Sequence, residues 1–258
     1  TAGRFPAGRL VVLARRRCPA RRTGLVALIR HPPSEDPALE NHADLFDGGS
    51  PRCQRLIDDL VARQYAVAPN YFPAHLVRAL RREALLRDRR GEFQSAGIGR
   101  RGEHQHNARV RRDRTLWLDG STLAQCRLLG EFEQLRLAVN RQLFMGLFDL
   151  ESHFAVYDPG AFYRRHLDAF NGRNGRVLSV VVYLNDQWRS EEGGRLRVWA
   201  DPDAIHPATE VEPRAGTLVC FLSDRIPHEV LEARRQRVSV AGWFRCNNST
   251  ADRPDPPR

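Results

Sequence analysis

The sequence predicts an α+β fold in which a jelly roll or barrel of short strands is backed by helices. Two observations predict it. Amphipathic, helix-like segments are confined to residues before about 145, and short strand-like runs separated by turn residues fill the chain after that point. Helices first and short strands afterwards is the order typical of such a fold. With 258 residues and 41% hydrophobic content, the chain is long enough to bury one substantial core.

Three segments have the apolar spacing of helices. Residues 53–63 and 73–87 each place their apolar residues on one face. Residues 123–144 form a longer segment whose apolar residues are spread broadly enough to be covered on most sides. A short strand is expected at residues 65–67, and residues 109–118 alternate like a strand.

The second half of the chain reads as strands joined by turns. Asp158-Pro159-Gly160, Asn171-Gly172 and Gly193-Gly194 supply turn residues between the runs. The expected strands are residues 153–157, 162–166, 177–184, 195–199, 210–212, 217–221, 229–231 and 238–244.

These elements predict one catalytic domain over residues 49–248, with helical support at 52–145 and a barrel core at 150–246. Residues 1–48 mix Arg, Pro and small residues without sustained periodicity, so we expect a disordered N-terminal arm. Residues 249–258 are expected to form a flexible tail.

The cysteine pattern bears on the compartment. Five cysteines are scattered without a CxxC pair, which favours neither a disulfide framework nor a zinc knuckle. A reducing cytoplasm fits this pattern best. No apolar stretch approaches membrane-spanning length, so we expect no membrane partner.

The net charge of +10 would ordinarily suggest nucleic acid as a partner. All 41 basic residues are Arg, however, which is more simply explained by a coding bias than by a binding face. Nucleic acid is therefore a disfavoured partner. A non-catalytic barrel or an Arg-mediated nucleic-acid binder is the alternative from another functional class.

A candidate metal site emerges from three residues. Two His and one carboxylate on one face of an iron ion leave positions free for a co-substrate and O₂. His166-Leu167-Asp168 ends a strand-like run, where period-two alternation sends both side chains to the same side. His228 starts another expected strand and could meet them across a barrel. A second triplet, His42-Ala-Asp44, lacks strand context and is interpreted as a chance pair of surface residues.

Arg237 lies nine residues after His228, on a strand rich in β-branched residues. An Arg that points into an apolar barrel is costly unless it meets an anion, and its planar fork suits a carboxylate. Each of these residues alone is more often structural. Their joint occurrence in a chain of short strands favours a functional site.

Several sequence blocks resemble the prolyl hydroxylase domain family, which comprises the hypoxia-inducible-factor prolyl hydroxylases and their bacterial relatives. The resemblance covers roughly residues 52–247. It is carried by Arg112-Asp113-Arg114-Thr115-Leu116-Trp117-Leu118-Asp119-Gly120, Tyr157-Asp158-Pro159-Gly160, Tyr163, His166-Leu167-Asp168, Tyr183-Leu184-Asn185, Gly193-Gly194-Arg195-Leu196-Arg197, Ser223-Asp224-Arg225, Pro227-His228-Glu229-Val230, Arg237 and Trp243.

The resemblance implies a double-stranded β-helix, a jelly-roll or cupin-like barrel that holds Fe(II) and 2-oxoglutarate. It also implies that O₂ is consumed, that succinate and CO₂ are formed, and that ascorbate serves as reductant. By the same carry-over, His166, Asp168 and His228 bind iron. The expected co-substrate residues are Arg237, Tyr183, Tyr157, Ser239 and Trp243.

The family's substrate is a prolyl residue of a protein, and the resemblance implies prolyl 4-hydroxylase activity. The bacterial relatives point to a translation factor as the target. The expected substrate-binding residues are Arg112, Asp113 and Arg176. A second hypothesis retains the chemistry but directs it to another residue or to a small molecule.

Overall fold

The computed structural model of the chain describes residues 50–97, 109–169, 175–247 and 249. The arm predicted for residues 1–48 and residues 250–258 of the predicted tail lie outside these ranges, and so does His42-Ala-Asp44.

Three helices confirm the three helical predictions: α1 (Pro51–Arg63), α2 (Ala74–Arg89) and α3 (Leu123–Leu143). Two of them begin at a side-chain cap, because the Ser50 hydroxyl accepts from the Cys53 amide and the Thr122 hydroxyl accepts from the Gln125 amide. No helix in the described ranges combines the length and apolar character needed to cross a bilayer.

The strands form two antiparallel sheets. The larger sheet has the order β1-β9-β6-β11-β4-β3-β2, and the smaller has the order β5-β10-β7-β8. The strands are β1 (Tyr65–Ala68), β2 (Gln94–Ser95), β3 (Arg114–Trp117), β4 (Asp149–Tyr157), β5 (Tyr163–His166), β6 (Arg176–Tyr183), β7 (Leu196–Val198), β8 (Thr209–Val211), β9 (Leu218–Leu222), β10 (His228–Val230) and β11 (Arg237–Arg245).

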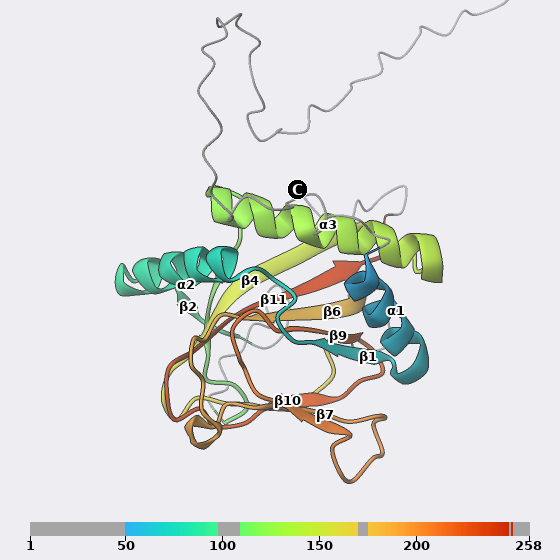
Figure 1. The fold of residues 1–258 in the computed structure, drawn as a ribbon. Helices are drawn as coiled ribbons and strands as arrows, with labels where there is room; N and C mark the ends of the chain where they lie inside the picture. The colour runs from blue at the N-terminus through green and yellow to red at the C-terminus, as the bar shows by residue number, and fades with distance from the viewer. Residues whose placement is uncertain (1–49, 98–108, 170–174, 248, 250–258) are drawn as a thin grey trace, which may run out of the picture. The chain divides into compact units, whose positions relative to one another are not determined.

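The helices lie on one side of the large sheet, and the small sheet lies on its other side (Figure 1). Two buried clusters follow from this layering. One contains Leu80 and Leu128 of the helices with Val240 of β11. The other lies between the two sheets and contains Tyr183 and Phe221. The opposed antiparallel sheets constitute the predicted double-stranded β-helix, with helices as its support.

The strand predicted at residues 109–118 is divided between the two sheets. β3 pairs with β4 of the large sheet, whereas the segment before it pairs with the edge of the small sheet. There the Arg112 amide donates to the Phe162 carbonyl, and the Arg164 amide donates to the Val110 carbonyl. Local alternation could not reveal this change of partner, because both halves are extended. β2, which pairs with β3, was not predicted.

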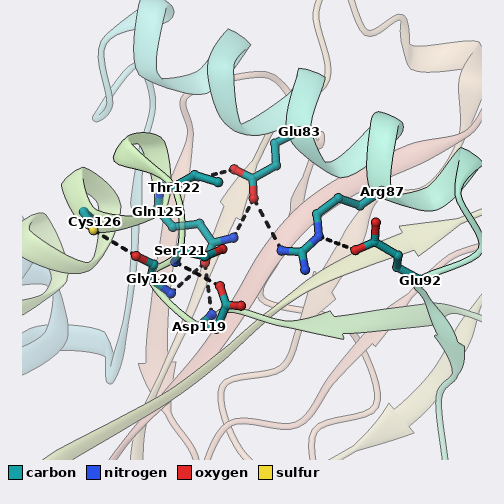
Figure 2. A network of polar contacts seen from close by, with 9 residues as sticks. All are labelled: Glu83, Arg87, Glu92, Asp119, Gly120, Ser121, Thr122, Gln125 and Cys126. Carbon is teal, nitrogen blue, oxygen red and sulfur yellow. Dashed lines mark hydrogen bonds and ion pairs between the residues drawn. The ribbon is translucent and has the colours of Figure 1, made fainter. Parts of the chain in front are cut away.

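A polar network fastens α2 to the turn between β3 and α3 (Figure 2). Glu83 accepts from the Thr122 hydroxyl at 2.7 Å and from the Gln125 side-chain amide at 2.6 Å. The Gln125 carbonyl oxygen in turn accepts from the backbone amides of Asp119 and Gly120. The turn that follows β3 is therefore held by buried side-chain contacts rather than by the ladder alone.

Candidate active site

The structure brings together the three residues that the sequence pattern proposed as metal ligands. His166 ends β5, Asp168 follows it by two residues, and His228 begins β10 directly opposite His166. One potential ligand atom from each residue lies within 4.8 Å of the others. Within the described ranges, this is the one group of at least three such side chains that could hold a metal ion.

A β-bulge turns β5 toward the metal site. His166 pairs with His228 and Tyr163 pairs with Val230, so two β5 residues oppose the single residue Glu229. The extra residue lets Tyr163 and His166, three positions apart, face the same cavity. Their rings stack with centroids 3.6 Å apart. The simple alternation assumed from the sequence does not hold within this strand.

Each histidine is oriented by a backbone carbonyl. Nδ1 of His166 lies 2.7 Å from the Arg164 carbonyl oxygen, and Nδ1 of His228 lies 3.2 Å from that of Ile226. Because a carbonyl oxygen only accepts, each Nδ1 carries the proton and each Nε2 keeps its lone pair for a metal. Both Nε2 atoms lie 3.6 Å from the Asp168 carboxylate.

Electrostatics keep His228 and Asp168 in the forms that bind metal. Burial, followed by the neighbouring His166, lowers the pKa of His228 to about 4, so its imidazole is neutral at pH 7. Burial alone would raise the pKa of Asp168, but His228 and His166 outweigh it and the pKa falls well below its usual range. A carboxylate and two imidazoles therefore face one point, and this donor set fits iron(II).

A second feature of the cavity is an anion site around Arg237. This guanidinium is 1% exposed, and it lies over the rings of Tyr157 and Tyr183 at 4.8 and 5.0 Å. Nε donates to the Gly194 carbonyl at 3.0 Å, and Nη1 lies 3.3 Å from the Ser239 hydroxyl. The buried Tyr183 hydroxyl has no hydrogen-bond partner among the described residues. A carboxylate would compensate the buried charge and also satisfy this hydroxyl.

Gly194 is required by the approach of Arg237. It adopts a positive φ of +64°, and a Cβ there would lie 3.1 Å from Cδ of Arg237. The Gly193-Gly194 pair, expected only as a turn, therefore also makes room for the anion site.

The cavity between the sheets joins the metal residues to the anion site. Trp243 also lines this cavity, far along β11 from Arg237 and opposite Ser179. Several residues that line the cavity were not predicted from the sequence. Period-two spacing from Tyr157 back along β4 was the signal that could have found His153. The lining residues are Arg111, His153, Ala155, Tyr157, Tyr163, His166, Asp168, Ser179, Val180, Val181, Leu196, Phe221, His228, Val230, Arg237, Ser239, Ala241, Gly242 and Trp243.

The three predicted substrate-binding residues differ in burial and in their contacts. Asp113 is buried, and both of its oxygens accept from Arg111, one of them at 2.7 Å. Arg111, not the predicted Arg112, lines the cavity and lies over the Tyr163 ring. Arg112 is exposed and packs on Phe162 instead. Cζ of Arg176 lies 3.6 Å from the centroid of the Trp243 ring, and Nη2 of Arg176 donates a hydrogen bond to the Glu151 carboxylate.

Comparison with known proteins agrees with this geometry. A sequence model of the 2OG-Fe(II) oxygenase superfamily matches residues 152–245, which contain all three metal residues and Arg237. The chain is 34% identical over 93 residues to a hypoxia-inducible factor prolyl hydroxylase of Caenorhabditis elegans. It is also 34% identical over 77 residues to a prolyl 3-hydroxylase of Xenopus laevis. It spans only 12% and 15% of the lengths of these two curated relatives.

Solved structures extend the likeness over most of the chain. A Pseudomonas putida prolyl-4-hydroxylase is 44% identical, with a TM-score of 0.68, over 74% of this chain and 97% of that one. A prolyl hydroxylase of Trichoplax adhaerens, in complex with a hypoxia-inducible factor peptide fragment, shares the fold. Its TM-score is 0.67 at 24% identity, over 74% of this chain and 88% of that one. The chain therefore belongs to the prolyl hydroxylase family of 2OG-Fe(II) oxygenases.

Proposed function

We propose that the protein is a prolyl 4-hydroxylase that acts on a proline within a protein substrate. The observation that carries the proposal is one cavity in which the metal triad, the Arg237 anion site and an aromatic wall converge. The 44% identity to the Pseudomonas putida prolyl-4-hydroxylase supports the choice of reaction.

The residues of this chain perform three tasks in such a reaction. His166, Asp168 and His228 would hold iron(II) through two imidazole nitrogens and a carboxylate. Arg237 and Tyr183 are placed to bind and orient the distal carboxylate of 2-oxoglutarate. When bound, iron(II) and 2-oxoglutarate would activate O₂, the oxidant: one oxygen atom would enter succinate, formed with CO₂, and the other would become the hydroxyl group on the C–H carbon.

The wall of the cavity suits a proline ring. Tyr163 and Trp243 contribute aromatic surface, and Val230 and Leu196 contribute aliphatic surface. Such a wall gains from burial of an apolar ring and excludes water from the reacting C–H bond. Arg111 is held by buried Asp113 beside Tyr163, where it can donate hydrogen bonds to the backbone carbonyls of a bound peptide.

The test is oxidation of a native protein extract by the purified enzyme with Fe(II) and 2-oxoglutarate. We expect a +16 Da proline in a discrete protein, formed in step with succinate, and a 4-hydroxyl position by comparison with authentic 3- and 4-hydroxyproline. His166→Ala should abolish the product, whereas His206→Ala, at an exposed histidine outside the cavity, should not. Turnover that depends instead on a free amino acid or another small metabolite would contradict the proposal. A 3-hydroxyl product would overturn the 4-position alone.

A further inference from the structure

The outer face of the small sheet carries a ladder of alternating charges. Arg197 of β7 lies 2.7 Å from Glu210 of β8 and 3.4 Å from Glu229 of β10. Arg195, which directly precedes β7, lies 3.4 Å from Glu210 and 3.3 Å from Glu212. Each of these two arginines therefore has two carboxylate partners from neighbouring segments of the sheet.

The arginines of β5, the edge strand of the small sheet, lack such carboxylate partners among the described residues. Its bulge sends Arg164 and Arg165 outward together, while Tyr163 and His166 face the cavity. Only Glu229 opposes the two arginines, and its carboxylate is already engaged by Arg197. Across the described part of the chain, neither Arg164 nor Arg165 forms an ion pair with a carboxylate. Two guanidiniums thus remain on the outer side of a strand whose other residues belong to the active site.

Aromatic rings hold these arginines in place. Arg164 lies over Phe162 at 4.5 Å, and Arg112 of the adjacent extended segment approaches the same ring at 5.1 Å. Arg165 lies over Trp199 at 4.4 Å and donates to the Pro202 carbonyl at 2.8 Å. Stacking covers the faces of a guanidinium and leaves N–H groups at its edge for carboxylates. Side chains ordered in advance also lose less entropy when a ligand binds.

We propose that Arg164 and Arg165 form a docking surface for acidic residues that flank the target proline. This proposal rests on the proposed function, since it assumes a polypeptide whose proline enters the cavity. An extended chain advances about 3.3 Å per residue, so residues a few positions from the proline can reach the outer side of β5. The compact patch is bordered by the carboxylates of the charge ladder, which fits a short acidic segment better than a long phosphate backbone.

The test is a competition between two proline-centred peptides in one reaction. The peptides share their central residues and differ only in flanks of Glu or of Lys, and mass spectrometry measures the ratio of their +16 Da products. This ratio equals the ratio of their kcat/KM values and is independent of how much of each enzyme holds iron. The wild-type enzyme should favour the Glu-flanked peptide by roughly tenfold or more, and added salt should reduce the preference.

Charge reversal supplies the decisive variant. The double substitution Arg164→Glu with Arg165→Glu should shift the preference toward the Lys-flanked peptide. The matched control is Arg55→Glu with Arg78→Glu, which makes the same change in net charge on exposed residues of α1 and α2 and should leave the ratio unchanged. A variant that gains activity on the Lys-flanked peptide must be folded, so loss of structure cannot imitate the expected result.

The outcomes separate the two proposals. If the wild-type enzyme hydroxylates no proline in these peptides or in the native extract, the proposed function fails. If it hydroxylates both peptides equally, or if the double reversal and the control change the ratio alike, the docking surface is wrong and the function stands. Displacement of the Glu-flanked peptide by a single-stranded oligonucleotide whose binding also requires Arg164 and Arg165 would overturn the choice of an acidic peptide.

Discussion

Ser179 donates a hydrogen bond to Oδ2 of Asp168 at 2.6 Å, from a hydroxyl that is itself 2.9 Å from the Ser223 hydroxyl. Both serines are buried. The pair holds the metal-binding carboxylate from the side of the large sheet, because Ser179 lies on β6 and Ser223 directly follows the neighbouring strand β9. The position of Asp168 therefore depends on two strands that contribute no ligand atom of their own.

Ser179→Ala should weaken metal binding while the fold persists. Loss of the hydrogen bond removes one constraint on the orientation of the Asp168 carboxylate, and we expect roughly a 10- to 100-fold rise in the Kd for Fe(II) or Mn(II). Anaerobic titration followed by tryptophan fluorescence measures it. Ser179→Thr, which retains the hydroxyl, should restore binding, and Ser152→Ala, at a buried β4 serine outside the cavity, should have no effect. Equal metal affinities for the wild type and Ser179→Ala would show that Ser179 does not position the Asp168 carboxylate for metal binding.

Arg237→Lys should impair co-substrate binding specifically. Lysine retains the charge but loses the planar fork between Tyr157 and Tyr183, so the Kd and KM for 2-oxoglutarate should rise about 10- to 100-fold. Calorimetry of the Mn(II)-loaded protein measures the Kd. The control is Arg235→Lys, which lies outside the cavity and pairs with Glu192. An unchanged Kd for Arg237→Lys would place the co-substrate elsewhere.

His153 should make folding stability depend on pH. Burial, reinforced by Arg111, lowers its pKa from 6.5 to about 4. The unfolded chain therefore takes up a proton that the folded chain resists, so stability is lost as pH falls from about 6.5 to about 4 and changes no further below that. The loss attributable to His153 at pH 5 should be about 2 kcal/mol.

Urea unfolding at pH 7 and pH 5 tests this dependence by comparing the wild type with His153→Leu. Other groups titrate in both proteins, so the difference between them isolates His153. The wild type should lose more stability between the two pH values than the variant does. Identical losses would show that the buried imidazole does not resist protonation.

Gln125→Ala should destabilise the fold through the network in Figure 2. Gln125 is fully buried, and its removal leaves the Asp119 and Gly120 amides and one Glu83 contact unsatisfied. We expect a loss of about 2 kcal/mol in the free energy of unfolding. Gln142→Ala, at an exposed position of the same helix, should change stability by less than about 0.5 kcal/mol. Denaturant titration of the two variants measures both free energies of unfolding. Equal losses would show that the hydrogen bonds of Gln125 do not stabilise the fold.

The sequence by itself determined the order of elements and the identities of the metal and anion residues. Helical and strand periodicities are local, so α1, α2, α3 and the strands after residue 145 were predicted near their observed bounds, except that β4 begins four residues before the predicted start at residue 153. His166-x-Asp168, His228 and Arg237 could be recognised because their spacing is a property of the chain itself.

Only the tertiary structure decided which neighbours face the cavity. The β5 bulge arises from pairing with β10, so four consecutive residues could not reveal that Tyr163 and His166 share a side while Arg164 and Arg165 point outward. Likewise, residues 110–112 pair with the edge of the small sheet, and this pairing places the side chain of Arg111 rather than that of Arg112 in the cavity. A side chain's direction within a strand depends on the register with its partner, and register is set by residues far away in the sequence.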